Sequence, residues 1–161
     1  MLKSHSCNKP DKNSVGTKVA LAGWVHRRRD HGGLIFIDLR DSEGIVQVVF
    51  NPDKSEKYHE IANQIRNEYV IRVSGKIALR PQGTKNPKLA TGDVEIIADS
   101  VQILNQSKTP PFYINEDIEV DENLRLEYRY LDIRRARMKN NLNLRHRVVK
   151  FMRDFLMLEG L

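Results

Sequence analysis

The chain has 161 residues, enough for one hydrophobic core or for a small domain plus part of a second. Its net charge of +6 and pI near 9.5 suit a polyanionic partner, although a plain basic protein has the same composition. The polar N-terminal segment lacks the apolar stretch of a secretory signal, and no window reaches the roughly 20 apolar residues of a membrane span. We therefore expect a cytoplasmic protein without a membrane segment.

A single cysteine, Cys7, excludes an internal disulfide, and no cysteine and histidine residues have the spacing of a zinc site. The sequence contains neither GxGxxG nor GxxxxGK[ST], and no nucleophile stands near a candidate base. We therefore expect no metal, no cofactor and no catalytic residue within this chain.

Apolar and polar residues alternate in five segments after the polar N-terminus, and each segment is bounded by turn residues. This pattern predicts strands at 18–28, 34–40, 45–50, 69–79 and 94–104.

The connections between these strands also have recognisable sequences. His31-Gly32-Gly33 and residues 41–44 are predicted to be hairpin turns, and residues 80–92 form a longer loop with two prolines and two glycines. Between the third and fourth strands, Ser55 is a candidate N-cap for a helix. The apolar face of that helix would contain Tyr58, Ile61, Ala62 and Ile65.

Five strands with a helix between the third and fourth are the order of an OB fold, a mainly β class built on a small five-stranded barrel. Such a barrel binds oligonucleotides on the face of its second and third strands, flanked by the loops after the first and fourth strands. The alternative is a barrel that binds a protein or has no ligand, because a fold does not determine a function.

Thr109-Pro110-Pro111 predicts a stiff connector and a domain boundary after the barrel. An acidic cluster follows, consisting of Glu116, Asp117, Glu119, Asp121 and Glu122. It either places negative charge before a helix that begins near Asn123 or belongs to a solvated linker. Residues 125–153 contain ten basic and two acidic residues, which predicts a basic helical face for RNA or for an acidic protein surface.

The last helix also has an apolar stripe at three- and four-residue spacing. The stripe consists of Leu144, Val148, Phe151, Phe155 and Leu158, and it is widened by Val149, Met152 and Leu156. Because the helix-ending Gly160 leads to no further element, we expect the chain to stop inside a larger protein. The alternatives are that the stripe packs on the barrel or dimerises.

The segment from Gly23 to Phe50, GWVHRRRDHGGLIFIDLRDSEGIVQVVF, places an aromatic and an amide on strands just after an arginine triplet. Alternation from 34 to 40 buries the isoleucines and Leu39 and leaves Phe36 on the wetter face. Alternation from 45 to 50 buries Val46, Val48 and Phe50, which leaves Ile45, Gln47 and Val49 on the opposite side. Phe36 and Gln47 are therefore predicted to share a surface.

Single-stranded RNA suits this combination of residues. An aromatic ring stacks on any base, an amide both donates to and accepts from a Watson–Crick edge, and arginines hold phosphates. In the alternative interpretation, Phe36 packs under a loop, Gln47 is a solvated strand residue and Arg27 to Arg29 only charge a sheet edge.

Three stretches together resemble the bacterial-type aspartyl-tRNA synthetases: residues 23–50, the loop ALRPQGTKNPKLATGDVEI and the junction LRLEYRYLDIRRARM. The resemblance covers nearly the whole chain, and related lysyl and asparaginyl enzymes share the barrel but not this form of the junction. It implies an OB-fold anticodon-binding domain at residues 1–105, a hinge at 106–135, and the first helix of a class II catalytic domain at 136–161.

In that family the full-length enzyme is a homodimer that attaches aspartate to tRNA(Asp) with ATP and Mg²⁺. The class II motifs that hold ATP and aspartate would fall beyond Leu161. The resemblance therefore implies that this chain binds the tRNA anticodon and does not itself catalyse aminoacylation.

The resemblance also implies individual roles at the anticodon. Phe36 matches the aromatic that stacks on the middle uracil, Gln47 matches the amide that meets the edge of that uracil, and Glu95 matches a carboxylate that meets the first base. Basic residues at the end of the first strand match those that hold the anticodon backbone, namely Arg27, Arg28 and Arg29.

The aspartate and asparagine anticodons share their first two bases, so selectivity depends on the third, which the loops after the first and fourth strands approach. These loops contain His31 and the pair Gly83 and Thr84. His31 and Gly83 resemble members with relaxed specificity, which also charge tRNA(Asn). The alternative is an ordinary turn histidine and an ordinary loop glycine.

Three functions thus remain open at the level of the sequence. The first is an anticodon-recognition module of an aspartate–tRNA ligase. The second is a stand-alone OB-fold protein that binds single-stranded nucleic acid, and the third is the corresponding module of an asparaginyl or lysyl enzyme.

Overall fold

The computed structural model describes residues 2–115 and 118–160. Glu116 and Asp117, which the sequence analysis grouped with a helix start, lie outside the described residues. The chain divides into two compact units, Met1–Thr109 and Pro110–Leu161.

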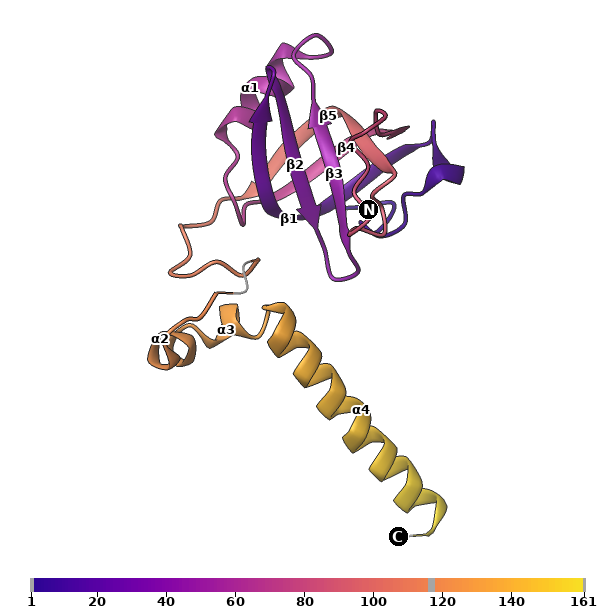
Figure 1. Cartoon of the computed structure of the whole chain (residues 1–161), viewed down its shortest axis with the longest axis vertical. Helices are drawn as coiled ribbons and strands as arrows, with labels where there is room; N and C mark the ends of the chain where they lie inside the picture. Colours follow the sequence, from indigo (N-terminus) through magenta and orange to yellow (C-terminus); the bar gives the residue numbers. More distant parts are fainter. Residues whose placement is uncertain (1, 116–117, 161) are drawn as a thin grey trace. The chain divides into compact units, whose positions relative to one another are not determined.

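The first unit is a five-stranded barrel with a helix between the third and fourth strands (Figure 1). Its elements are η1 (Lys12–Ser14), β1 (Lys18–His31), β2 (Leu34–Arg40), β3 (Ile45–Phe50), α1 (Glu56–Gln64), β4 (Val70–Leu79) and β5 (Val94–Asn105). The strands close in the order β1-β2-β3-β5-β4, and β1 pairs with both β2 and β4. The predicted fold is confirmed, and Ser55 caps α1 as expected. The main difference is that β1 continues three residues further, to His31.

The core of the barrel consists of the inward side chains of all the strands and of α1. In β2 the predicted alternation is confirmed, because Ile35, Ile37 and Leu39 are buried while Phe36 is half-buried. In β3 the predicted burial of Val46, Val48 and Phe50 is confirmed, but the outward Gln47 and Val49 are buried as well, at 6% and 4% exposed. The reason is that β3 lies between β2 and β5, so side chains of both neighbouring strands cover its outward face.

The N-terminal segment is fastened to the turn between β2 and β3 by Asp41. One carboxylate oxygen of Asp41 accepts hydrogen bonds from Lys3 Nζ and from the backbone N–H of Cys7, both at 2.9 Å. The other oxygen accepts the backbone N–H groups of Glu43 and Gly44 at 2.9 and 3.1 Å. Burial by itself would raise the pKa of Asp41, but these hydrogen bonds outweigh it and lower the pKa to about 2.

The second unit contains α2 (Glu122–Glu127), α3 (Arg129–Asp132) and α4 (Ala136–Leu158). Asp121 caps α2 by accepting the backbone N–H groups of Asn123 and Leu124. This part of the acidic cluster therefore supports a helix start, as one of the two interpretations predicted. A small apolar cluster of Phe112, Ile114 and Leu131 holds the connecting segment to these short helices.

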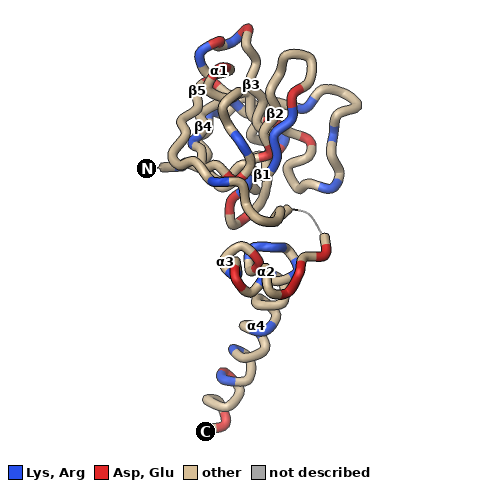
Figure 2. The backbone as a smooth tube through the Cα atoms, turned by 90° about the vertical axis from the view of Figure 1, so that its left-hand side faces the viewer, with Lys and Arg blue, Asp and Glu red and all other residues tan. Residues whose placement is uncertain are grey.

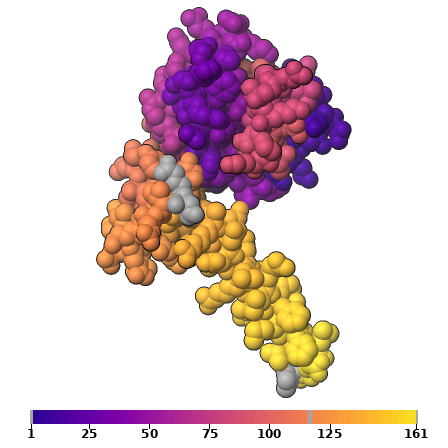
Figure 3. All heavy atoms as spheres, viewed as in Figure 1, coloured from indigo at the N-terminus to yellow at the C-terminus, as the bar shows by residue number. Residues whose placement is uncertain are grey.

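No described residue of α4, the helix drawn in light orange to yellow in Figure 3, is buried. Phe151 is 71% exposed and Leu158 is 85% exposed. The predicted apolar stripe is therefore present on the surface of α4. None of the described helices combines the length and the apolar character needed to cross a bilayer.

Candidate nucleic-acid interface

The outward faces of β1, β2 and β3 bring several of the predicted site residues together. Side chains directly opposite each other on paired strands share a face of the sheet. Arg29 lies opposite Phe36, Arg27 lies opposite Asp38, and Asp38 lies opposite Gln47. The arginine triplet is visible as a blue stretch of β1 in Figure 2. The aromatic, the amide and two of the arginines therefore occupy one surface.

Phe36 does not belong to the hydrophobic core. Its side chain is half-buried, and it is neither in the core cluster nor among the apolar side chains packed against that cluster. Its ring is thus placed at the edge between protein and solvent, where a planar ligand can reach it.

Gln47 is the centre of a hydrogen-bonded chain of side chains. Its Nε2 donates to Glu95 Oε2 at 2.9 Å, and its Oε1 lies 3.4 Å from Arg29 Nη2. The same Arg29 nitrogen donates to Asp38 Oδ1 at 2.6 Å. The amide of Gln47 is therefore oriented in advance, with its NH₂ group toward Glu95 and its carbonyl toward Arg29. A nucleotide that contacts Gln47 has to share or replace these hydrogen bonds.

Arg80 completes this cluster from the end of β4. Its side chain is only 6% exposed, and its Nε donates to the backbone carbonyl of Val94 at 3.0 Å. Its Nη2 is buried and has no hydrogen-bond partner in the described part of the chain. Buried polar groups are normally paired, so this donor is an exception among the described residues.

Burial shifts the pKa values in this cluster, and the neighbouring charges counteract it. Burial raises the pKa of Glu95, while the hydrogen bond from Gln47 and the charge of Arg80 oppose the rise. Burial likewise raises the pKa of Asp38, and Arg29 is the first of the groups that oppose it. Burial lowers the pKa of Arg80, although the charge of Glu95 acts in the other direction. The face thus holds two carboxylates and three guanidinium groups, those of Arg27, Arg29 and Arg80.

Arg28 lies apart from the other two arginines. It is opposite Ile37, whose side chain belongs to the core, so it leaves the sheet on the other face from Arg27 and Arg29. Its Nη2 lies 3.0 Å from Asp30 Oδ1 and 3.2 Å from Asn63 Oδ1 of α1. The alternation of side chains along β1 therefore removes Arg28 from the surface that contains Phe36.

The residues expected to control selectivity lie in two exposed turns. His31 ends β1 and is followed by two glycines with positive φ angles. Gly83 also has a positive φ, of 82°, which a residue with a side chain rarely adopts. Thr84 donates its hydroxyl to the carbonyl of Pro81 at 2.9 Å. The roles of these residues stay predictions.

Comparison with known proteins agrees with this geometry. Residues 19–104 match the family model described as OB-fold nucleic acid binding domain. The chain belongs to this family. A second model, described as tRNA synthetases class II (D, K and N), matches residues 121–160 in the second unit.

The curated relatives of this OB-fold protein are tRNA ligases. It is 62% identical over 156 residues to an aspartate–tRNA(Asp/Asn) ligase of Dehalococcoides mccartyi and 58% identical over 156 residues to one of Syntrophomonas wolfei. These alignments cover 97% of the chain but only 26% and 27% of the relatives, so the chain spans about a quarter of their length. The crystal structure of asparaginyl-tRNA synthetase from Pyrococcus horikoshii superimposes with a TM-score of 0.81 at 26% identity, covering 99% of this chain and 36% of that one. The resemblance predicted from the motifs is therefore confirmed.

Two residues of the OB-fold surface were not predicted as site residues. The alternation of β2 places Asp38 on the same face as Phe36, but it does not indicate the contact of Asp38 with Arg29. Arg80 directly follows β4, and nothing in the local pattern indicates that its guanidinium group is buried.

Proposed function

We propose that this chain is the anticodon-recognition part of an aspartate–tRNA ligase and that its barrel binds the anticodon loop of tRNA(Asp). The observation that carries the proposal is the half-buried ring of Phe36 on the same outward face as the oriented amide of Gln47. The ring would stack on a splayed base while the amide meets the Watson–Crick edge of that base.

The charged residues of the face extend this contact. Arg29 lies opposite Phe36 and Arg27 lies opposite Asp38 on the same face, and both would hold the phosphates of the loop. Glu95 is an acceptor for the amino or imino groups of the neighbouring base. Arg80 would contribute its positive charge to this face from below the surface, beside Glu95.

In this proposal residues 1–105 are the anticodon domain, residues 106–135 are the hinge, and residues 136–161 begin a class II catalytic domain. The parent is a cytoplasmic homodimer that uses ATP and Mg²⁺ to attach aspartate to tRNA. Catalysis belongs to the rest of the parent. His31 and Gly83 support acceptance of tRNA(Asn) in addition to tRNA(Asp), in agreement with the substrates named for the relatives.

Binding of labelled anticodon stem-loops, measured by fluorescence anisotropy, tests the proposal. Stem-loops with the aspartate and the asparagine anticodons are expected to bind within tenfold of each other, a difference below about 1.4 kcal/mol. A stem-loop with an anticodon that differs at the middle base is expected to bind at least tenfold more weakly. Equal affinity for all three would instead indicate a sequence-independent single-strand binder, which is the second candidate function.

A further inference from the structure

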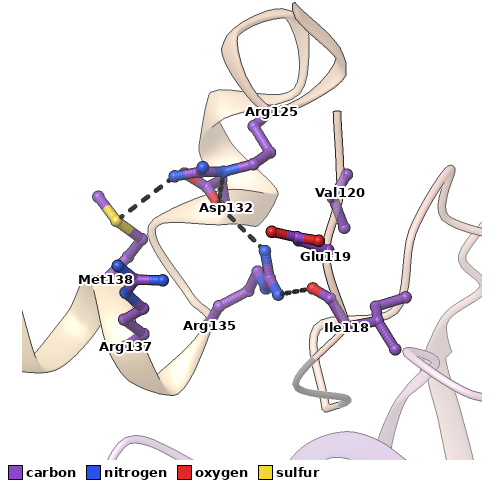
Figure 4. A pocket seen from close by; sticks show the side chains of 8 residues that line it. All are labelled: Ile118, Glu119, Val120, Arg125, Asp132, Arg135, Arg137 and Met138. Atoms are coloured by element: carbon purple, nitrogen blue, oxygen red, sulfur yellow. Dashed lines mark hydrogen bonds and ion pairs between the residues drawn. The ribbon is translucent and has the colours of Figure 1, made fainter. Parts of the chain in front are cut away.

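A buried carboxylate in the second unit gathers three arginines around itself (Figure 4). Asp132 is fully buried, and it accepts Arg125 Nε at 3.0 Å and Arg129 Nη1 at 2.7 Å. Arg135 Nη1 lies 3.7 Å from the same carboxylate. The hydrogen bond to Asp132 raises the pKa of Arg125, so that guanidinium group stays charged. One negative charge therefore orients three positive ones.

A cavity of about 280 Å³ opens beside this cluster. Its wall combines Arg125, Arg135 and Arg137 with the apolar side chains of Ile118, Val120 and Met138. Figure 4 shows Arg125, Asp132, Glu119 and Arg135 at the centre of this group, with Ile118 on one side and Arg137 and Met138 on the other.

Two features of the cavity remain unexplained by the packing of the helices. Arg137 is exposed and forms no hydrogen bond or ion pair with any residue that the structure describes. In addition, the N-cap of α4 is Arg135, which makes no side-chain capping bond, and the first turn of α4 has no acidic residue. Among the described residues, no side chain caps the N-terminus of this 23-residue helix, which lies beside the cavity.

The described charges leave this region positive. Arg125, Arg129, Arg135 and Arg137 face three carboxylates, those of Asp132, Glu119 and Glu122, so these described side chains have an excess of one positive charge. The carboxylate of Asp132 is already shared by three arginines, and Glu119 is exposed.

We propose that this cavity binds a phosphate group. A phosphate accepts several charge-assisted hydrogen bonds at once, which suits the unpaired guanidinium group of Arg137 beside the N-terminus of α4, with the positive charges of Arg125 and Arg135 close by. The phosphate belongs either to an RNA backbone or to a small phosphorylated molecule, and the chemistry of recognition is the same for both. A purely structural role of the cluster explains Arg125, Arg129 and Arg135, but it does not explain Arg137.

Three variants of the full chain test this site. Arg137→Gln removes the unpaired guanidinium group, and Glu119→Gln removes the carboxylate that competes with an anion. Arg153→Gln is the matched control, because Arg153 is also an exposed residue of α4 and its replacement changes the charge equally. None of these three side chains packs in the apolar cluster of the second unit, so the variants are expected to fold.

The first probe is inorganic phosphate, titrated at constant ionic strength while the arginine Nε–H signals are followed by NMR. Saturable shifts are expected, with affinity about fivefold weaker in Arg137→Gln and about threefold stronger in Glu119→Gln, the range for a single accessible charge pair. Arg153→Gln is expected to change the affinity less than about twofold.

The second probe is an RNA hairpin, titrated into the same variants in a Phe36→Ala background so that binding at the barrel face is weakened equally in all of them. A greater loss in Arg137→Gln than in Arg153→Gln identifies the RNA backbone as the source of the phosphate. Equal losses for RNA, combined with saturable phosphate binding that depends on Arg137, identify a small phosphorylated molecule. The proposal is overturned when neither probe gives saturable shifts, or when the two arginine variants behave alike with both probes.

Discussion

Phe36 and Phe50 provide a matched pair of aromatic residues with opposite surroundings. Both belong to paired strands of the same barrel, Phe36 in β2 and Phe50 in β3. Phe50 is 2% exposed and is among the largest buried side chains, whereas Phe36 lies outside the core cluster. Replacement of each ring by alanine should therefore separate binding from stability.

The expected magnitudes differ clearly between the two variants. Phe50→Ala leaves a cavity in the core, which should lower the free energy of unfolding by about 3 to 5 kcal/mol. For a domain of this size each lost kcal/mol lowers the Tm by about 4 to 8 °C. Phe36→Ala should cost less than about 1 kcal/mol of stability, while the lost base stacking should weaken stem-loop binding by about 1 to 3 kcal/mol, or roughly fivefold to 150-fold.

Urea unfolding followed by circular dichroism, together with anisotropy titration of the aspartate stem-loop, measures both quantities. Binding by Phe50→Ala is measured at a temperature where that variant is folded, and it should stay within a few-fold of the wild type. An unfolding free energy for Phe36→Ala as low as that of Phe50→Ala would place the ring of Phe36 in the core. Unchanged binding by Phe36→Ala would show that the ring does not stack on a base.

Three further variants test other parts of the structure. The pKa of Asp41 is lowered to about 2, so its contribution to stability is complete above about pH 4 and is lost as the pH falls through 2. Asp41→Asn should thus lower the free energy of unfolding by about 2 kcal/mol at pH 7 but hardly at pH 2. Equal losses of unfolding free energy at the two pH values, measured by urea unfolding, would contradict this role of Asp41. Arg80→Gln removes a buried unpaired donor and the positive charge beside Glu95. The variant should therefore weaken stem-loop binding about tenfold, while the free energy of unfolding changes by less than about 1 kcal/mol. A stability loss without a binding loss would assign Arg80 to the scaffold. Asp132→Asn removes the charge that orients Arg125, Arg129 and Arg135, so amide hydrogen exchange in α2 and α3 should become about tenfold faster while the barrel strands keep their protection. Unchanged exchange in α2 and α3 would show that the arginines are held by other contacts.

Several features of this protein followed from local sequence alone. The alternation in β2 depends only on the period of a strand, so it correctly predicted the buried isoleucines and the outward position of Phe36. The helix starts at Ser55 and Asp121 also depend on local sequence, because an N-cap side chain bonds to backbone groups two or three residues away. The same period predicts that Arg28 faces away from Arg27 and Arg29, a consequence that the sequence analysis did not draw.

The burial and the partners of Gln47 depended on the tertiary structure. Glu95 is 48 residues away in the chain, and it reaches Gln47 only because β5 lies beside β3 in the barrel. Arg80 became a buried donor for the same reason, since the end of β4 pairs with the start of β5. Local pattern determines which way a side chain leaves its strand, whereas strand order determines what covers it and which charges it meets.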